Sequence, residues 1–342
     1  MIPHLVDSPP PTPPPTPPAV PENLLATSDL DGDVLAALLE LACSVKRDPN
    51  QYRDALRGRS VALLFEKPSL RTRASLEVGL HRLGAQAVIF DQQDSHIGAR
   101  ESVHDLGRNL ERWFDAVAAR VHRHEVLEAL AESCGVPVLN TLSDAHHPCQ
   151  SLADLMTLHE RGIDPVNSRI AFVGDGNNVC HSLIHGVVSL GGSIVVISPP
   201  EFGPAAEVLE WATDRGAVTG GSVETSADPD AVAGADAVYT DAWISMGQTD
   251  DDAKRRVFQS FQVGPRLMSM AGPEAIFMHC LPAHRGEEVV DEVIDGPRSV
   301  VFDQAENRLH AQNAWFLASL GDSPITSSSS SFSSCDSAAP NS

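Results

Sequence analysis

The sequence predicts an α/β protein of two domains, each built on a mainly parallel sheet that is flanked by helices. Short apolar runs of strand length alternate with amphipathic helical segments, a pattern typical of parallel sheets covered on both faces. The chain has 342 residues, which is more than one typical core requires. Its nine strand candidates suit two sheets of four or five strands better than a single sheet.

The strands are predicted from short apolar runs that are bounded by turn residues. They lie at 61–65, 87–90, 116–121 and 136–139 in the first half, and at 170–173, 194–197, 237–240, 275–279 and 299–302 in the second. A helical segment at about 148–161 occupies the midpoint. We expect it to cross from the first domain, 23–147, to the second, 148–320. The C-terminal helix is expected to pack back on the body of the protein.

The segments 1–22 and 321–342 fall outside both predicted domains. Ten of the 25 prolines lie in the first 21 residues, where the run from Pro9 to Pro18 favours extended polyproline II. The Ser-rich end has too few apolar groups to offset the entropy of ordering it. We expect both ends to be disordered. The first segment fits neither a secretory signal nor an Arg-rich transit peptide, which favours the cytoplasm.

Charge and composition narrow the class of partner. The formal net charge is −22, which disfavours nucleic acid, so an anionic substrate has to be met by a local cluster of Arg. No apolar run reaches the length of about 18 residues that a membrane span needs, so we expect no membrane partner. The six cysteines are scattered without a Cys-x-x-Cys pair, which indicates reduced thiols in the cytoplasm.

The stretch Phe65-Glu66-Lys67-Pro68-Ser69-Leu70-Arg71-Thr72-Arg73 joins an apolar strand to the start of a helix. With Ser69 as N-cap and Arg71 and Thr72 in the first turn, the unpaired N–H groups and the guanidinium group could bind a phosphate. An ordinary capped surface helix with its Arg side chains in solvent explains the same residues. The motif alone leaves both interpretations open.

Other candidate site residues follow the predicted strands at their carboxyl ends, where ligands bind in sheets of this kind. They are Arg120, His147, Gln150, Asn177, Asn178, Asp241, Ser245, Met246, Cys280 and Arg308. Each has a plainer explanation when taken alone. His147 could cap a helix, Cys280 could be a small core residue and Asp241 could form a turn.

Two further patterns do not support a cofactor. Gly174-Asp175-Gly176-Asn177-Asn178-Val179 resembles a dinucleotide fingerprint, but Val179 stands where the third Gly belongs and no suitable acid follows the next strand. The histidines His122, His124, His146 and His147 lack a Cys or acidic partner at ligand spacing. We therefore predict neither a cofactor nor a metal.

Five motifs together resemble the signatures of the ornithine carbamoyltransferases. They are Ser69-Leu70-Arg71-Thr72-Arg73, His147-Pro148-Cys149-Gln150, Asp241-Ala242-Trp243-Ile244-Ser245-Met246-Gly247, His279-Cys280-Leu281-Pro282 and Glu306-Asn307-Arg308, and the resemblance covers about 29–320. It implies transfer of the carbamoyl group of carbamoyl phosphate to the δ-amine of L-ornithine, which gives citrulline and phosphate in arginine biosynthesis. The Asp-x-x-x-Ser-Met-Gly loop distinguishes ornithine enzymes from relatives that use aspartate.

The resemblance also implies a role for each part of the chain. Domain 23–147 would bind carbamoyl phosphate and domain 148–320 would bind ornithine, with closure of the two excluding water. The implied carbamoyl phosphate residues are Ser69, Leu70, Arg71, Thr72, His96, Arg120, His147, Gln150, Cys280, Leu281 and Arg308. The implied ornithine residues are Asn178, Asp241, Ser245 and Met246, and the implied catalytic residues are Arg71, Arg120, His147, Asp241 and Cys280.

By the same resemblance, Arg120, His147 and Gln150 would donate hydrogen bonds to the carbamoyl oxygen, while Asp241 and Cys280 would orient the amine. In this family, each active site is also completed by a residue from a neighbouring subunit, which stands in a loop before an Ile/Leu-Gly pair. Here His96 precedes Ile97-Gly98, which implies at least a homotrimer.

Several alternatives remain. Leu70 replaces the more common Thr and removes a hydroxyl donor from the phosphate motif, so carbamoyl phosphate binding could be weaker. Cys280 could be a covalent nucleophile, although no His that would activate it is evident. The acceptor could be another amine, such as putrescine or an N-acyl-ornithine. The chain could also be a non-catalytic paralogue that binds carbamoyl phosphate or a protein partner through its Pro-rich arm.

Overall fold

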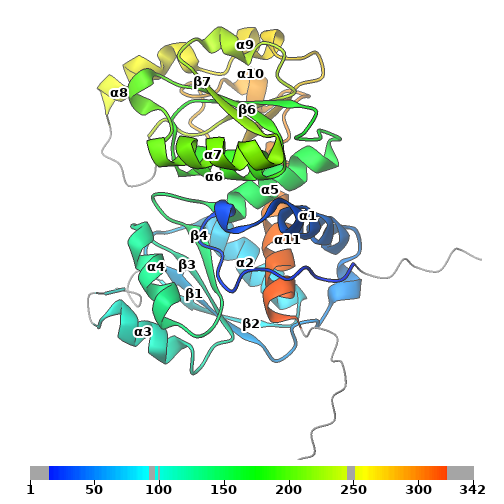
Figure 1. Ribbon diagram of the computed structural model, residues 1–342, viewed down its shortest axis with the longest axis vertical. Coiled ribbons are helices and arrows are strands. Elements are labelled where there is room, and N and C mark those ends of the chain that lie inside the picture. The colour runs from blue at the N-terminus through cyan, green and yellow to red at the C-terminus, as the bar shows by residue number, and fades with distance from the viewer. Residues whose placement is uncertain (1–14, 92–96, 99–100, 245–250, 322–342) are drawn as a thin grey trace, which may run out of the picture.

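A computed structural model describes residues 15–91, 97–98, 101–244 and 251–321 of the chain. It contains two parallel sheets, one in each half, with helices on their faces (Figure 1). One sheet has four strands and the other has five. The predicted α/β class and the division into two sheets are confirmed.

The first sheet has the strand order β2-β1-β3-β4 and is parallel throughout. Its strands are β1 (Ser60–Phe65), β2 (Gln86–Phe90), β3 (Ala116–Arg120) and β4 (Val138–Leu142). Its helices are α1 (Gly32–Arg47), α2 (Leu70–Arg82), α3 (Val103–Leu110) and α4 (His124–Ser133), with short 3₁₀ turns at Thr27–Asp29 and Pro49–Tyr52.

The second sheet has the order β7-β6-β5-β8-β9 and is also parallel. Its strands are β5 (Arg169–Val173), β6 (Ser193–Ile197), β7 (Ser222–Ser226), β8 (Ala237–Thr240) and β9 (Ile276–His279). Its helices are α6 (Asn178–Ser189), α7 (Ala206–Thr219), α8 (Asp252–Phe258), α9 (Pro265–Met270) and α10 (Asp291–Ile294), with 3₁₀ turns at Pro200–Phe202, Pro229–Val232 and Gln259–Phe261.

Strand β1 shows why the strands of these sheets are continuous apolar runs in the sequence. Val61, Leu63 and Phe65 belong to the largest core, while Ala62 and Leu64 belong to a smaller core shared with α3 and α4. Because successive side chains point to opposite faces, a strand that is covered on both sides has to be apolar at every position.

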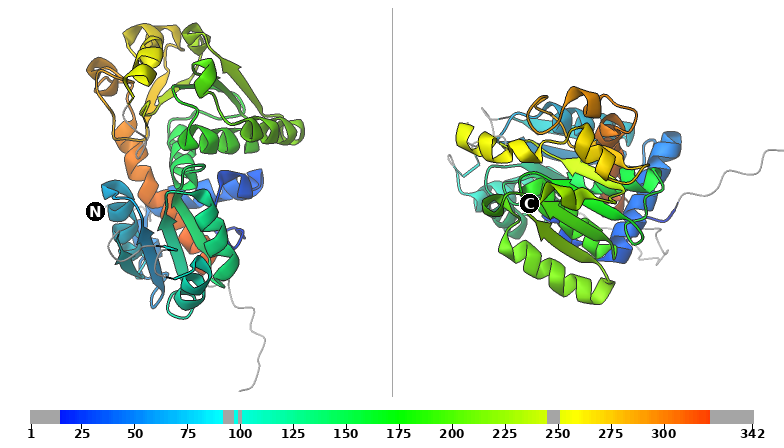
Figure 2. Two further views of the ribbon diagram at one scale, coloured as in Figure 1. Left: turned by 90° about the vertical axis from the view of Figure 1, so that its left-hand side faces the viewer. Right: turned by 90° about the horizontal axis from the view of Figure 1, so that it is seen from above.

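Two helices join the halves of the molecule. α5 (Pro148–Glu160) connects β4 to the second sheet, and α11 (Val301–Leu320) returns from the second half and packs on α1, α2 and α5 (Figures 1 and 2). The largest core runs through both helices and includes residues of both sheets. The midpoint helix and the C-terminal helix that packs back are therefore confirmed.

Two strand predictions differ from the structure, and one strand was not predicted. The predicted strand at 299–302 is wrong: Ser299 makes one isolated bridge to Phe277, and α11 begins at Val301. Strand β7 was not predicted, because it lies at the sheet edge and is partly exposed, with the polar sequence SVETS. Strand β4 lies two residues later than predicted, since it follows Pro137, which has no N–H to donate.

No helix among the described residues combines the length and the apolar character that a membrane span requires.

Candidate active site

A cavity of about 800 Å³ lies where the carboxyl ends of the two sheets meet. Ten of the predicted site residues line it: Ser69, Arg71, Arg120, His147, Gln150, Asn178, Asp241, Cys280, Leu281 and Arg308. They come from both halves of the chain, as expected for ligand binding beyond the strand ends. The predicted His96, Ser245 and Met246 lie outside the described residues.

The start of α2 forms one wall of the cavity. Ser69 is its N-cap, and its hydroxyl accepts a hydrogen bond from the backbone N–H of Thr72 at 3.3 Å. Arg71 faces the cavity, whereas Arg73 pairs with Glu77 on the surface. The side chain of Leu70 is 82% exposed and is not part of the lining. The phosphate-site interpretation of this motif therefore describes Arg71, and the interpretation as an ordinary surface helix describes Arg73.

Arg308 connects α11 to the start of α2. Its guanidinium group donates to the hydroxyl of the buried Thr72 at 2.8 Å, and Arg308 itself is buried at the cavity wall. The sequence placed Arg308 after a strand, but it lies inside α11. Thr72 itself does not line the cavity. Its hydroxyl group accepts a hydrogen bond from Arg308, which does.

The charges of this wall are positive although the whole chain is strongly negative. Burial, and then the neighbouring Arg308, lower the pKa of Arg120 to about 10. Burial together with Arg308 and Arg120 holds the pKa of His147 well below its usual range, so its ring is neutral. Clustered cations raise one another's energy, and an anion placed among them relieves that repulsion.

His147 is the N-cap of α5, and Gln150 lies in the first turn of this helix. The backbone N–H of His147 donates to the hydroxyl of Ser182 at 2.7 Å, which fixes the start of this helix against α6. The Nε2 atom of Gln150 donates to Oδ1 of Asp154 at 2.8 Å. The Oε1 atom of Gln150 has no hydrogen-bond partner among the described residues. The two side chains face the same cavity, as their spacing predicts.

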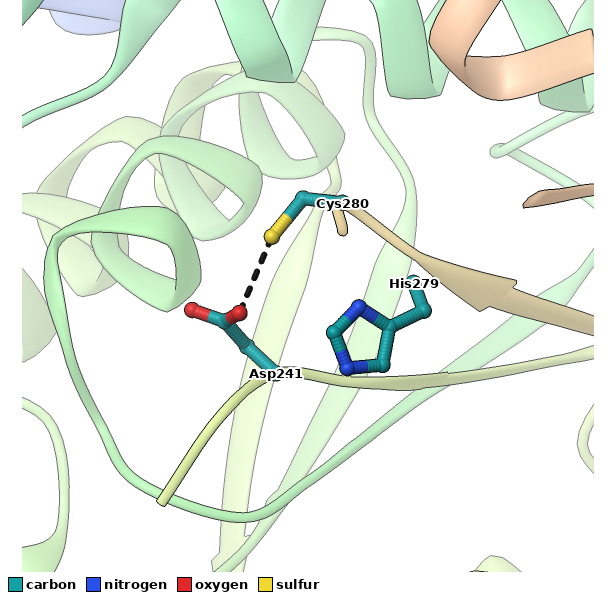
Figure 3. A group of neighbouring side chains, drawn as sticks. All are labelled: Asp241, His279 and Cys280. Carbon is teal, nitrogen blue, oxygen red and sulfur yellow. Dashed lines mark hydrogen bonds between the residues drawn. The ribbon is translucent and has the colours of Figure 1, made fainter. Parts of the chain in front are cut away.

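Asp241 and Cys280 point toward one another across the ends of β8 and β9 (Figure 3). The Cys280 thiol donates to one carboxylate oxygen at 2.9 Å, and the amide of Asn177 donates to the other at 2.7 Å. Burial and the adjacent Asp241 raise the pKa of Cys280 well above its usual value. A neutral thiol is a poor nucleophile, which argues against a covalent role.

His279 holds the turn that follows Cys280. Its Nδ1 accepts a hydrogen bond from the backbone N–H of Leu281 at 2.9 Å, and its Nε2 lies 3.1 Å from a carboxylate oxygen of the buried Glu288. Asp241, His279 and Cys280 bring potential metal ligands within 4.8 Å of one another. Both ring nitrogens of His279 are already hydrogen-bonded, so binding a metal there requires breaking one of these bonds.

Sequence reasoning missed a buried ion pair in the lining. Lys254 on α8 donates to a carboxylate oxygen of Asp175 at 2.8 Å, and its ammonium group lies 4.9 Å from the ring centroid of Phe202. Burial raises the pKa of Asp175. Asp175 directly follows β5 in the Gly-Asp-Gly turn, which was the available signal. Lys67 also lines the cavity next to the phosphate motif.

Histidine rings cluster behind the cavity, where β4 meets α6. The ring of His146 lies 5.0 Å from that of His124 and 5.3 Å from that of His185. Burial and neighbouring rings lower the pKa of His146 to about 4 and that of His185 to about 3. These two residues are therefore neutral at ordinary pH.

The predicted ornithine ligand Asn178 links the two halves. Its amide nitrogen donates to the backbone carbonyl oxygen of Ser143 at 2.6 Å. Asn178 begins α6 and Ser143 follows β4, so this hydrogen bond crosses from the second sheet to the first. A ligand at Asn178 would contact the junction between the two halves.

Comparisons with known proteins agree on one family. Residues 22–160 match the model "Aspartate/ornithine carbamoyltransferase, carbamoyl-P binding domain", and residues 166–319 match "Aspartate/ornithine carbamoyltransferase, Asp/Orn binding domain". The chain is 47% identical to an ornithine carbamoyltransferase of Hyperthermus butylicus, over 85% of this chain and 95% of that protein. It is 46% identical to one of Shewanella oneidensis, over 86% and 97%.

Solved structures show the same similarity. The ornithine carbamoyltransferase of Pyrococcus furiosus superposes with a TM-score of 0.86 at 44% identity, covering 88% of this chain and 98% of that one. The enzyme of Thermus thermophilus gives a TM-score of 0.79 at 46% identity, covering 89% and 100%.

Proposed function

The chain belongs to the aspartate/ornithine carbamoyltransferase family and is an ornithine carbamoyltransferase, and we propose that the cavity between its sheets is where citrulline forms. The observation that carries this proposal is the arrangement of two unlike walls on one cavity. Arg71 stands in the first turn of α2, where Arg308 is bonded to Thr72, and the Asp241–Cys280 pair stands at the ends of β8 and β9. The first wall suits a phosphate and the second suits an amine.

On the first wall, the start of α2 binds the phosphate of carbamoyl phosphate. The N-terminal N–H groups of the helix and the Arg71 guanidinium group meet its oxygens. As the C–O bond breaks, negative charge collects on the leaving phosphate. Arg71 and Arg308 stabilise that charge more than the charge of the bound substrate, which lowers the barrier.

The carbamoyl group lies between Arg120, His147 and Gln150. Arg120 and the neutral His147 donate hydrogen bonds to its carbonyl oxygen, which becomes more negative in the tetrahedral intermediate. Gln150 differs from our expectation that it donates to the same oxygen. Its nitrogen end is turned to Asp154 and its Oε1 is free to accept, so we assign it to the carbamoyl NH₂ group.

On the second wall, Asp241 and Cys280 orient the δ-amine of ornithine. A free amine of this kind titrates near 10.4 by analogy with Lys, so it has to lose a proton before it attacks. The cations Arg120 and Arg308 favour the neutral amine. The amine nitrogen then forms a bond to the carbamoyl carbon, the C–O bond to phosphate breaks, and the phosphate leaves with the electron pair and takes up the proton that the attacking nitrogen loses.

Four finer assignments complete the proposal. The reaction serves arginine biosynthesis, and its setting is the cytoplasm. The assembly is a homotrimer or a multiple of trimers, in which His96 reaches the active site of a neighbouring subunit. Asn178, Ser245 and Met246 bind the amino acid end of ornithine.

The test is citrulline or carbamoyl-amine formation by the purified protein from carbamoyl phosphate. Ornithine, putrescine, N-acetylornithine, N-succinylornithine and aspartate are offered separately. Turnover with ornithine alone is expected. Turnover with a different amine would support the proposed phosphate wall but replace ornithine as the proposed acceptor. No turnover with any of these amines would point to a non-catalytic paralogue.

A further inference from the structure

Asp154 is a fully buried carboxyl group that lies behind the cavity and does not line it. It sits one turn after Gln150 on α5. Its Oδ1 accepts hydrogen bonds from two side-chain amides, that of Gln150 at 2.8 Å and that of Gln304 on α11 at 2.7 Å. No step of the reaction described above uses Asp154.

The direction of these hydrogen bonds is fixed by a backbone group. The N–H of His279 can only donate, and it donates to Oε1 of Gln304 at 2.9 Å. The nitrogen end of Gln304 therefore faces Asp154, whose Oδ1 is the acceptor. The same Oδ1 requires a donor from Gln150 as well. The orientation of the Gln150 amide follows from this chain of donors and acceptors.

We propose that Asp154 is a positioning residue that holds Gln150 with its Oε1 toward the carbamoyl NH₂ group and thereby selects carbamoyl phosphate against acyl phosphates without an N–H. This proposal rests on the proposed function, because Gln150 acts on carbamoyl phosphate in that site. Acetyl phosphate has the same phosphate and carbonyl groups but carries a methyl group in place of NH₂. A buried acceptor facing that methyl group loses its hydrogen bond, which is the kind of mismatch that gives strong discrimination.

The chemistry of the position supports this role. Burial raises the pKa of Asp154 to about 7, opposed by hydrogen bonds from Gln150, Gln304 and Tyr239. A buried carboxyl group is costly, and an apolar side chain of similar volume would suit a purely structural position better. Protonation at Oδ2 leaves Oδ1 as an acceptor, so Gln150 stays oriented on both sides of this pKa.

The experiment compares two replacements of Asp154 with a matched control. Asp154→Leu removes the acceptor, while Asp154→Asn retains an acceptor oxygen in the same place. The control is Thr157→Val on the same helix: Thr157 is also buried and accepts a hydrogen bond from Asn307 on α11 at 2.9 Å, but does not line the cavity. Each variant is assayed for the KM of carbamoyl phosphate and for the Ki of acetyl phosphate as a competitive inhibitor, with ornithine held at saturation.

The readout is the ratio of that Ki to that KM. We expect Asp154→Leu to lower the ratio by roughly tenfold or more, through a higher KM with little change in Ki. Asp154→Asn should stay within about threefold of the wild type, and Thr157→Val should match it. Equal changes of KM and Ki in Asp154→Leu would show a merely structural role. An Asp154→Asn ratio as low as that of Asp154→Leu would also overturn the proposal.

Two additions keep the test decisive. If Asp154→Leu does not fold, as judged by circular dichroism, Asp154→Ala removes the same acceptor and is read by the same ratio. In a Gln150→Leu background, Asp154→Ala should produce no further change in the ratio, since Asp154 acts through Gln150; a further change would contradict that. A wild-type protein that makes no citrulline would refute the proposed function, whereas an active enzyme with an unaffected ratio would refute only the role of Asp154.

Discussion

The Sγ atom of Cys280 lies 2.9 Å from Oδ1 of Asp241, and the thiol is the donor of this hydrogen bond. Burial and the carboxylate raise the pKa of Cys280 well above its usual value, so the sulfur keeps its proton. The second carboxylate oxygen is held by Asn177. Cys280 and Asn177 together fix the plane of the Asp241 carboxylate, the group that we propose meets the attacking amine.

The first prediction separates this orienting role from covalent catalysis. Cys280→Ser retains a donor and should keep kcat within about tenfold of the wild type, whereas Cys280→Ala should lower it by about 10- to 100-fold, as loss of a hydrogen bond to a charged group implies. Steady-state citrulline assays measure both. A Ser variant as inactive as the Ala variant, or a trapped carbamoyl-thiol, would indicate a nucleophile instead.

The second prediction concerns the hydrogen bond between Arg308 and Thr72. Thr72→Val removes the hydroxyl group and keeps the shape, so Arg308 loses a buried partner. We expect the KM of carbamoyl phosphate to rise by about 10-fold, from a hydrogen bond worth roughly 1.5 kcal/mol. Thr72→Ser keeps the hydroxyl group and is the control. An unchanged KM in Thr72→Val would mean that Arg308 is positioned by other contacts.

The third prediction concerns the departure at Leu70. Because its side chain is 82% exposed and outside the cavity lining, Leu70→Thr should change the KM of carbamoyl phosphate by less than about twofold. Ser69→Ala, which removes the N-cap hydroxyl group beside it, should raise that KM and lower the melting temperature. A several-fold lower KM in Leu70→Thr would show that the missing hydroxyl group does weaken phosphate binding.

The fourth prediction is that stability falls in mild acid because of the buried histidines. His146 and His185 have folded pKa values of about 4 and about 3. Below pH about 6.5 the unfolded chain binds protons at these sites while the folded chain does not. The free energy of unfolding should therefore decrease as pH falls from 6.5 toward 4, by up to about 1.4 kcal/mol per pH unit for each histidine.

Thermal unfolding across this pH range measures the effect. His185→Phe should flatten the slope, while His104→Gln, at a 72% exposed side chain, should leave it unchanged. The raised pKa of Asp154 has the opposite effect on the free energy of unfolding, because the folded state binds a proton at Asp154 at a higher pH than the unfolded state does. A slope that is identical in the wild type and His185→Phe would contradict the prediction.

Much of the fold was predictable because the strands are covered on both faces. Runs such as SVALLF in β1 are apolar at every position, and this pattern requires no knowledge of the partner strands. Strand β7 and the start of α11 were not predictable in the same way. Edge strands need no apolar run, and Val301 and Phe302 have high β propensity but continue directly into a helix.

The candidate site also contains residues that the sequence pattern predicts and residues that it does not. Ser69, His147 and Asp241 stand in local motifs at strand ends, so a one-dimensional pattern predicts that they gather at one cavity. Asp154 and Lys254 carry no such signal. Their importance comes from hydrogen bonds to residues far away in the chain. Asp154 meets Gln304 only because α5 packs against α11, and Lys254 on α8 meets Asp175 at the end of β5.

In the proposed function the two walls of one cavity hold different substrates, and a paired kinetic measurement on two variants tests this assignment. Arg71→Ala should raise the KM of carbamoyl phosphate by at least about tenfold and change that of ornithine little, while Asp241→Asn should raise the KM of ornithine and change that of carbamoyl phosphate little. Both variants should retain the wild-type circular dichroism spectrum. Equal changes in both KM values for each variant, or the reverse pairing of variant and substrate, would contradict the assignment of one substrate to each wall.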